Sequence, residues 1–534
     1  MIIPRPTALT RAPGRFVLPA ELRITTGPGG ERPAELLAGY LGSDRARTDQ
    51  GPEIRLETRT ATAKNPTTPE AYHLEIHPDR VLLTAPDEAG LFHGVQSLRQ
   101  LLGADGASLP CLTVDDAPMV PWRGLMLDVA RHFMPLDFLY ELVDQLALNK
   151  LNVLHLHLTD DQGWRMEIEG LPRLTEVGAW RTESMIGPAG SDRFDARPHG
   201  GFYTRKDLSA LVRFAASRGI RVVPEIEMPG HARAALAAYP ELGVHGATMP
   251  VWTSWGVCHD IFGAHDAALD FCREVLGQVT DVFPDQFVHL GGDECPTDQW
   301  ESDPFSRNRA AELGLADPAR LHGWFLAQMQ AFLAECGRRS VSWDGASPEP
   351  ADLPPELVLA AWLDRADAVS SIGRGHQVLL TPHQSTFFDY IQRDHPDEPQ
   401  GQPGEVVTVE DVYAFDPLAS GAGERLPVAD PFAPGEPQPG VLGAQAQLWT
   451  EFLPTPEQVR YAAYPRLCAF AEAAWSTGPR DYADFRVRLA RQAPLLGRLG
   501  ALTPGAATLL ATGHGDGHAD GHANTAGRPA RIGL

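Results

Sequence analysis

Apolar, strand-like runs alternate with helical segments between about residue 119 and residue 505. The expected strands are residues 122–129, 151–158, 221–227, 286–291, 339–344, 357–362, 377–381 and 442–449. Helical patterns lie between them, as at residues 136–148, 205–217, 267–282 and 321–336. Eight strands with intervening helices predict an α/β fold, a (β/α)8 TIM barrel. A doubly wound open sheet is the alternative, but the number of strands and the polar residues at their ends favour the barrel.

The residues on either side of the predicted barrel have other patterns. Residues 1–118 are typical of a small α+β domain, with strands at 71–76 and 81–84 and a helix at 88–102. Residues 506–534 are rich in Gly and His, so we expect a disordered tail, with weak metal binding as the alternative. Residues 185–201, 393–404 and 419–440 are rich in Gly, Pro and acidic residues and are expected to be loops.

Charge and cysteine spacing limit the possible partners. The formal net charge of -24 argues against nucleic acid and anionic membranes. The six cysteines are scattered without a C-x-x-C pair, which disfavours a zinc cluster or a disulfide framework. Neither a secretory signal nor a run of about 18 apolar residues is visible. We therefore expect a soluble, cytoplasmic protein, with leaderless export as the alternative.

Two adjacent carboxylates follow the fourth expected strand. Gly291 and Gly292 end that strand, and Asp293 and Glu294 come next. Glycine allows a turn and a close backbone approach that other residues would hinder. Because barrel folds carry their chemistry at the carboxyl ends of the strands, we expect Glu294 to be a general acid/base and Asp293 its partner.

Reactive or recognition-capable side chains recur at the other strand ends. They are Asp128, Arg131 and His132; Asp160, Asp161 and Trp164; Glu225, Glu227 and His231; Trp343 and Asp344; Trp362; and Trp449 and Glu451. Indoles stack on the apolar faces of sugars, while carboxylates and arginines bind hydroxyls. Glycosidases use pairs of Asp or Glu residues on either side of the scissile bond. The ring of residues therefore indicates a glycosidase.

The adjacency of the two carboxylates constrains the mechanism. The Cα atoms of Asp293 and Glu294 are only about 3.8 Å apart. Their side chains can hardly flank a sugar from opposite faces, as an acid and a separate nucleophile must. Either a carboxylate on another strand is the nucleophile, or the substrate supplies its own.

Five motifs occur in order along the predicted barrel: RHF at 131–133, DDQGW at 160–164, PEIEMPGH at 224–231, HLGGDE at 289–294 and LWTE at 448–451. Together they closely resemble glycoside hydrolase family 20, the β-N-acetylhexosaminidases, and the resemblance extends from about residue 15 to residue 500. It implies retaining hydrolysis in which the substrate's own 2-acetamido oxygen attacks the anomeric carbon and forms an oxazoline-type intermediate. The implied substrate is an oligosaccharide with a terminal β-linked GlcNAc or GalNAc, and no metal or organic cofactor is required.

The resemblance also implies a role for each site residue. Glu294 would protonate the leaving oxygen and then deprotonate water, while Asp293 would hold the acetamido N–H. Asp160 and His231 would form a pair that supports the acid/base and tunes its pKa. The implied sugar contacts are Arg131, Trp343, Trp362, Asp389, Trp449 and Glu451.

One position departs from the family pattern. The family usually has Tyr two residues before the Asp of the seventh strand motif, where this chain has Phe387 before Asp389. A missing donor to an oxygen that develops charge could cost a few kcal/mol. Either Tyr390 or a loop residue compensates, or the enzyme is slower or prefers another substrate.

Other interpretations remain beside the leading one. His155 and His157 alternate on a strand and are expected to be structural, although His157 could face the site. Asp128 and Glu227 are either supports behind the site or structural charges at the barrel mouth. For the whole protein, the alternatives are a disaccharide-releasing family member and a non-catalytic sugar-binding protein on the same scaffold.

Overall fold

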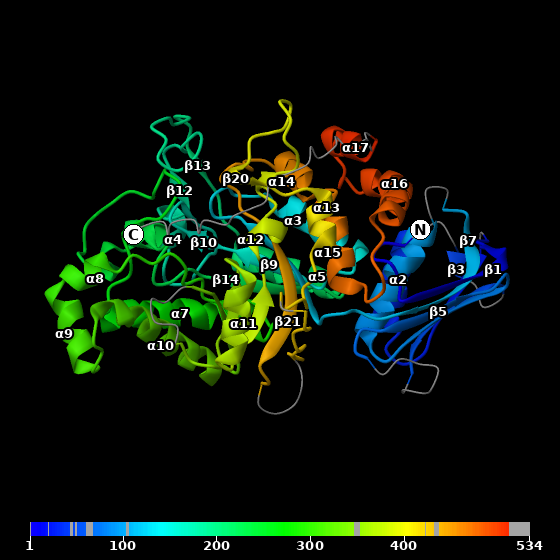
Figure 1. Ribbon diagram of the computed structural model, residues 1–534, viewed down its shortest axis with the longest axis horizontal. Helices are drawn as coiled ribbons and strands as arrows, with labels where there is room; N and C mark the ends of the chain where they lie inside the picture. The colour runs from blue at the N-terminus through cyan, green and yellow to red at the C-terminus, as the bar shows by residue number, and fades with distance from the viewer. Residues whose placement is uncertain are drawn as a thin grey trace.

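The fold is centred on a closed barrel of eight strands, seen in a computed structural model that describes residues 2–19, 21–42, 46–47, 51–59, 68–102, 106–345, 353–421, 423–431 and 437–511 (Figure 1). The barrel strands are β8 (Trp122–Asp128), β9 (Val153–His157), β14 (Arg221–Glu225), β15 (Phe287–His289), β16 (Arg339–Trp343), β17 (Val358–Ala361), β18 (Gln377–Leu380) and β21 (Gly440–Leu448). Every neighbouring pair is parallel, and β21 closes the barrel on β8. The predicted (β/α)8 barrel is confirmed, and each expected strand has its counterpart.

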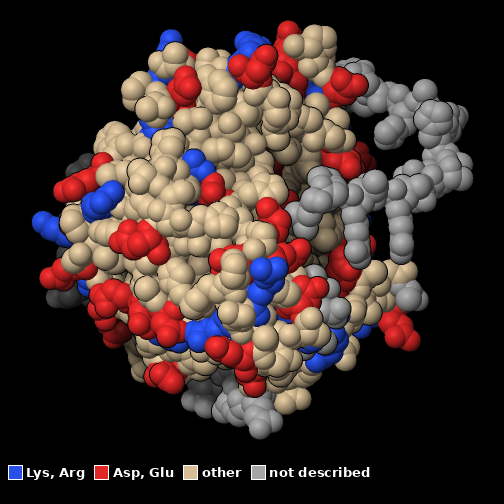
Figure 2. Space-filling model, turned by 90° about the vertical axis from the view of Figure 1, so that its left-hand side faces the viewer, with Lys and Arg blue, Asp and Glu red and all other residues tan. Residues whose placement is uncertain are grey.

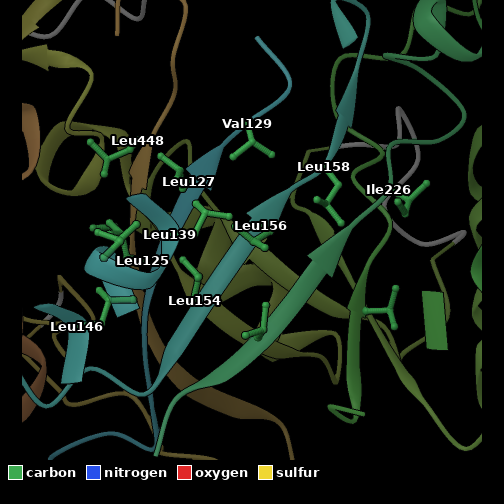
Figure 3. Close-up of a cluster of buried hydrophobic side chains, with 14 of the residues drawn as sticks. Leu125, Leu127, Val129, Leu139, Leu146, Leu154, Leu156, Leu158, Ile226 and Leu448 are labelled. Atoms are coloured by element: carbon green, nitrogen blue, oxygen red, sulfur yellow. The ribbon is translucent and has the colours of Figure 1, made fainter. Parts of the chain in front are cut away.

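Both faces of the barrel strands are buried, which explains their nearly continuous apolar sequences. Side chains on the outer face, such as Leu125, Leu127 and Leu154, pack with Leu139 and Leu146 of the helix α3 (Leu136–Leu148) (Figure 3). The side chains between them point into the barrel, where a separate cluster includes Trp122, Val153, Val223, Phe287 and Trp343. Alternate positions of one strand therefore belong to different environments, and the inward positions near the strand ends are available for chemistry.

Helices surround the barrel and follow the predicted order. The longer ones are α5 (Arg205–Ala216), α7 (Asp266–Val282), α9 (Pro304–Glu312), α10 (Leu321–Glu335), α11 (Arg365–Gly373), α14 (Pro456–Ala463), α15 (Arg466–Trp475) and α16 (Tyr482–Arg498). Local sequence sets where these helices begin. At the start of α5, for example, Thr204 and Asp207 form a reciprocal capping box. Shorter helices are α4 (Arg173–Glu176), α6 (Arg233–Ala238), α8 (Asp298–Ser302), α12 (His383–Thr386) and α13 (Val409–Ala414).

Short strands and 3-10 turns complete the loops that follow the barrel strands. They are β10 (Thr159–Asp160), β11 (Gly163–Trp164), β12 (Trp180–Arg181), β13 (His199–Gly200), β19 (Tyr390–Ile391), β20 (Gln402–Val406), η1 (Pro240–Leu242) and η2 (Pro318–Arg320). The stretches 185–201 and 393–404 are largely irregular, as expected, apart from β13 and the start of β20. Part of the third expected loop, residues 422 and 432–436, lies outside the described residues.

The N-terminal region forms a seven-stranded mixed sheet with the strand order β1-β7-β5-β6-β4-β2-β3. Its elements are β1 (Ala8–Val17), β2 (Glu21–Thr26), α1 (Glu31–Leu41), β3 (Ala46–Arg47), β4 (Glu53–Thr58), β5 (Tyr72–Ile76), β6 (Arg80–Ala85), α2 (Glu88–Leu102) and β7 (Ser108–Asp116). Figure 1 shows this sheet at one end of the molecule, with α2 on the side that faces the barrel. The sheet and both helices enclose their own hydrophobic cluster, which confirms the small α+β domain before the barrel.

A group of buried charges joins the two domains, and we call it the junction cluster. Lys150, which follows α3, donates to Asp116 at 2.8 Å and to the Tyr72 hydroxyl at 2.9 Å. Arg123 of β8 forms an ion pair with Glu70. The cluster consists of Glu70, Tyr72, Asp116, Arg123, Lys150 and Trp475, whose indole N–H donates to Asp116 at 2.9 Å. The N-terminal domain is thus fixed to the barrel end opposite the carboxyl ends of the strands.

The end of the chain differs from the expected tail. The helix α17 spans Pro504–Ala511, so its residues include the first six of the stretch 506–534. Pro504 suits the first position of a helix, and Ala and Leu are strong helix formers, so the composition of this short segment explains the difference. The remaining residues of the expected tail, 512–534, lie outside the described residues.

The surface fits the acidic composition. The face in Figure 2 carries many Asp and Glu side chains with Arg and Lys side chains between them. None of the helices in the described part of the chain combines the length and the apolar character needed to cross a membrane.

Candidate active site

The turn after β15 brings the two adjacent carboxylates to the mouth of the barrel. Gly291 and Gly292 have φ angles of 65° and 90°, and Glu294 also has a positive φ of 44°. A Cβ at Gly291 would lie 1.8 Å from a carboxylate oxygen of Glu227, so only glycine fits there. The glycine pair therefore has two functions: it permits the turn, and it leaves room for Glu227 behind Asp293.

Asp293 and Glu294 differ in exposure. The Asp293 Oδ1 atom is buried and has no hydrogen-bond partner in the described structure. The Glu294 side chain is 42% exposed. Burial raises the pKa of both carboxyls, while His231 opposes the rise in each case. Glu294 is thus suited to carry a proton that it can give away, and Asp293 offers a free oxygen to a donor.

His231 lies between Glu294 and two further carboxylates. Its Nδ1 atom is 3.1 Å from Asp160 Oδ1 and 3.0 Å from Asp161 Oδ2, and its Nε2 atom is 3.8 Å from Glu294 Oε2. His231 has a positive φ of 47°, which holds the ring in this position after β14. Burial opposes its charge, but Asp160 and Asp161 outweigh burial and raise its pKa well above the ordinary value.

Arg131, after β8, connects Asp160 to the aromatic side of the site. Its Nη2 atom is 2.8 Å from Asp160 Oδ2, and its guanidinium lies 4.9 Å from the ring of Trp449. Burial opposes the ionisation of Asp160, but Arg131 and His231 hold its pKa well below the usual range. Burial raises the pKa of Glu451, and Arg131 opposes that rise. Arg131 thus stabilises the negative charge of Asp160 and lies near a second carboxyl.

Asp389, before β19, is a further carboxyl on this side, near Glu451. Burial and the nearby Glu451 raise the pKa of Asp389 well above its ordinary value. Its Oδ1 atom is buried and has no hydrogen-bond partner in the described structure. Asp389 therefore offers a polar atom that the protein itself does not satisfy, as a binding site for hydroxyl groups requires.

Three tryptophans and Phe387 form an aromatic wall. Trp343 and Trp449 have ring centroids 5.8 Å apart, and Trp449 is 6.2 Å from Phe387. Phe387 in turn stacks at 6.3 Å on Trp362. The Tyr390 hydroxyl is 3.5 Å from His383 Nδ1, and its ring is 6.5 Å from Phe387. The structure thus brings Phe387 into the wall at the position where the family usually has Tyr.

All ten predicted site residues lie in one connected group. Contacts run from Glu294 through His231, Asp160 and Arg131 to the tryptophans, with Asp293 beside Glu294. Glu451 raises the pKa of Asp389, and Arg131 opposes the rise in the pKa of Glu451. They meet because the carboxyl ends of parallel barrel strands converge. Their individual roles stay predictions.

Asp128 and Glu227, for which the sequence allows two interpretations, have defined positions in the structure. Asp128 accepts from the backbone N–H groups of Ala130, Arg131 and Thr450 at 2.8, 3.0 and 3.1 Å, so it connects the ends of β8 and β21. Glu227 accepts from the Gly292 N–H at 3.2 Å, and burial together with Asp293 and Glu225 raises its pKa well above the ordinary value. Asp128 therefore shapes the strand ends, whereas Glu227 supports the turn.

Sequence reasoning placed Glu225 at a strand end but gave it no role, and the structure shows it at the centre of a buried polar network inside the barrel. Its oxygens lie within 3.0 Å of His155, His157 and His289. The available signal was the alternation on β9 and β14, where residues 155, 157 and 225 occupy inward positions. Several groups of histidines and carboxylates in the described residues are close enough to hold a cation, including His231 with Asp293 and Glu294. The expectation that no metal is needed stays a prediction.

A (β/α)8 barrel whose strand ends carry carboxylates, an arginine and a wall of indoles defines the class of barrel glycoside hydrolases. Comparison with known proteins gives the particular family. Residues 120–478 match the catalytic domain of glycosyl hydrolase family 20, and residues 1–117 match domain 2 of the same family. The chain therefore belongs to glycosyl hydrolase family 20.

Characterised relatives agree with this assignment. A β-hexosaminidase of Porphyromonas gingivalis is 34% identical over 511 residues, which are 91% of this chain and 62% of that protein. This chain thus spans less than two thirds of that relative. A β-N-acetylhexosaminidase of Cellulomonas fimi is 34% identical over 521 residues, which are 93% of this chain and 95% of that protein.

Solved structures show the same fold over nearly the whole chain. A family 20 exo-β-N-acetylglucosaminidase from Vibrio harveyi, in complex with N-acetylglucosamine, has a TM-score of 0.81 and 29% identity, and the match covers 94% of this chain and 77% of that one. A mutant β-hexosaminidase from Streptomyces plicatus, in complex with the product GlcNAc, has a TM-score of 0.75 and 31% identity, with 95% and 97% covered.

Proposed function

We propose that the chain is an exo-acting β-N-acetylhexosaminidase, which removes terminal GlcNAc or GalNAc from the non-reducing end of β-linked oligosaccharides. The hydrolysis retains the anomeric configuration and uses the substrate's acetamido group as the nucleophile. The observation that carries the proposal is the adjacency of Asp293 and Glu294 combined with the unpartnered, buried Oδ1 atom of Asp293. An acetamido N–H is a donor of the kind that this oxygen lacks.

The reaction uses the two carboxyls in succession. Glu294 donates its proton to the glycosidic oxygen as the bond breaks, and the acetamido oxygen closes on the anomeric carbon. Asp293 accepts the acetamido N–H and stabilises the positive charge that develops on the oxazoline-type ring. Glu294, now ionised, takes a proton from water, which opens the ring and releases the sugar with its original configuration.

The remaining site residues hold the terminal sugar. Trp343, Trp362 and Trp449 provide indole surfaces for the acetamido methyl group and the sugar face. Arg131 offers a planar fork of donors, and Asp389 and Glu451 offer carboxyl oxygens for hydroxyl groups. Two solved relatives are complexes with N-acetylglucosamine, which supports this choice of sugar.

The test compares two aryl β-glycosides that differ only at C2. We expect hydrolysis of the N-acetylglucosaminide with loss of activity in Glu294→Gln, and at least about 100-fold slower hydrolysis of the plain glucoside. Equal rates on the two substrates would contradict assistance by the acetamido group. Chromatography of the products from a short oligosaccharide separates monosaccharide from disaccharide release. Binding without turnover would favour a non-catalytic sugar-binding protein.

A further inference from the structure

Glu225 of β14 is the centre of a buried network behind the site. The side chain is fully buried, and both carboxylate oxygens have neighbours. Oε2 lies 2.5 Å from His157 Nδ1 and 3.0 Å from His155 Nε2. Oε1 accepts from the Trp343 indole N–H at 2.8 Å and lies 2.9 Å from His289 Nδ1. Glu225 thereby connects four barrel strands directly beneath the residues proposed to bind the sugar.

His157 of β9 links this network to the site. Its Nδ1 atom faces Glu225, and its Nε2 atom lies 2.8 Å from Asp160 Oδ2. Because an ionised carboxylate only accepts hydrogen bonds, both ring nitrogens need a proton in this position. Burial alone would lower the pKa of His157, but Glu225 and Asp160 outweigh burial and raise it to about 10. His157 is therefore a buried cation between two anions.

The contacts continue from His157 to the acid/base residue. Asp160 binds His157 through Oδ2 and His231 through Oδ1, and His231 Nε2 lies 3.8 Å from Glu294 Oε2. Charges alternate along this row: Glu225 is negative, His157 positive, Asp160 negative and His231 positive. The two inner members, His157 and Asp160, have the opposite charge on both sides, so the orientation of one ring depends on the next.

We propose that Glu225 and His157 are positioning residues for the hydrolysis: through Asp160 they fix the orientation and the charge of His231, and thereby the state in which Glu294 gives and takes its proton. Neither residue touches the sugar in this scheme. The inference depends on the proposed function only in that Glu294 acts as the acid/base of the reaction.

The other groups around Glu225 do not provide the same link. His155 has Glu225 on one side and accepts from the Gln445 amide at 3.0 Å on the other, which suits a neutral ring. Burial lowers the pKa of His155 to about 4. His289 contacts Glu225 and stacks on His155 at 4.8 Å, but no described contact joins it to Asp160. His157 is thus the imidazole that connects Glu225 to the site.

Further charged side chains face the row and contribute to the electrostatics of its members. Arg131 lies beside both Asp160 and His157, with its Nη1 atom 3.5 Å from His157 Nε2. Asp161, in the turn between β10 and β11, contacts His231, and Glu227 lies 3.9 Å from His157. The row also affects the pKa of the Asp293 carboxyl, which Glu225 raises and His157 lowers.

The experiment compares His157→Gln with the matched control His155→Gln, using the pH dependence of kcat/KM on an aryl N-acetylglucosaminide. The two histidines are two residues apart on β9 and contact the same oxygen of Glu225, but only His157 contacts Asp160. Loss of the His157 cation raises the pKa of nearby carboxyls. Both the acidic and the alkaline limb of the pH profile should therefore move to higher pH by about one unit in His157→Gln. We expect kcat to fall about 10–100-fold there, and the limbs to stay in place in His155→Gln.

Glu225→Gln gives the opposite sign. It removes an anion that raises the pKa of Asp293, so the acid limb should move to lower pH. A merely structural disturbance would not shift the limb in opposite directions in the two variants. The inference would be overturned if the limbs of the pH profile did not move in His157→Gln. It would also be overturned if the acid limb moved equally and in the same direction in His157→Gln and Glu225→Gln.

A measurement on the unmodified protein keeps the test valid if a variant does not fold. An ordinary histidine is neutral at about pH 8. Neutron diffraction at that pH should nevertheless show deuterium on both ring nitrogens of His157. Deuterium on a single nitrogen would contradict the proposed state. A wild-type enzyme that fails to hydrolyse the aryl glycoside would refute the proposed function, whereas unmoved limbs in an active enzyme would refute only the positioning role.

Discussion

Two groups of buried charges in this molecule differ in how completely they are satisfied. In the junction cluster, each charged side chain has a partner of opposite charge. Lys150 and Asp116 have no exposed side-chain surface, and both oxygens of Asp116 accept hydrogen bonds, one from Lys150 and one from Trp475. At the barrel mouth, buried atoms of Asp293, Asp389, Glu227 and His231 have no hydrogen-bond partner in the described structure.

The difference separates a structural site from a functional one. A buried polar group without a partner costs free energy, so a fold retains it only where something else recovers the cost. The junction cluster is complete by itself and joins two domains. In the proposed reaction, a bound sugar supplies the donors and acceptors that the barrel mouth lacks. We therefore expect mutations in the junction cluster to affect stability, and mutations at the mouth to affect turnover.

The largest effect should come from Glu294→Gln, which removes the proton that the reaction needs. General acid/base groups contribute about 10²–10⁴-fold to rate, so kcat should fall about 1,000-fold. The side chain is 42% exposed, and its removal should leave Tm unchanged. Steady-state kinetics and a thermal melt on the same preparation check both parts. A clear drop in Tm would place Glu294 with the structural charges instead.

Lys150→Met tests the other side of the comparison. Breaking a buried ion pair leaves Asp116 charged and unpaired, which costs about 3–5 kcal/mol. Denaturant unfolding should show that loss, while kcat per folded molecule stays the same. The control is Lys206→Met on the exposed face of α5, which should change neither quantity. Loss of turnover without loss of stability in Lys150→Met would show that the junction influences the site.

Asp293→Asn should move activity and stability in opposite directions. We expect kcat to fall about 100-fold, because the amide cannot stabilise positive charge. Burial raises the pKa of Asp293, so its ionised form destabilises the fold at neutral pH. The variant should therefore match or exceed the wild type in Tm at pH 7. This advantage should disappear below about pH 4, where the unfolded carboxyl is also protonated. A variant less stable than the wild type at pH 7 would contradict the assignment.

The sequence predicted the fold well where local signals agree with tertiary environment. The helices α2 and α3 have the predicted ends, and the eight barrel strands are recognisable because both faces are buried and apolar. Residues far apart in the chain, such as Arg131 and Glu451, could be placed together because the barrel brings strand ends to one mouth.

The network around Glu225 could not be predicted in the same way. A histidine on a buried strand has the same sequence signature whether it is neutral, as His155, or doubly flanked by carboxylates, as His157. The distinction depends on the register between β9 and β14, which places Glu225 opposite His157. Sequence periodicity gives the face of each strand, but it does not give the shift between two strands.

The smallest effect concerns Phe387, where the wall can be tested for a missing hydroxyl. Phe387 is 8% exposed and lies between Trp362 and Trp449, two of the indoles proposed to line the acetamido pocket and the sugar face. One added donor to an oxygen that develops charge should raise kcat about tenfold in Phe387→Tyr. Steady-state kinetics with the aryl N-acetylglucosaminide measure this change.

Phe388→Tyr is the matched control for this last change. Phe388 is fully buried on the opposite side of the chain, where its ring lies 6.4 Å from Phe470 of α15. A hydroxyl there enters the apolar layer around the barrel, so Phe388→Tyr should lower Tm and leave kcat unchanged. If Phe387→Tyr instead lowers Tm without raising kcat, the aromatic wall is packing rather than a sugar contact, and Phe387 belongs with the structural residues.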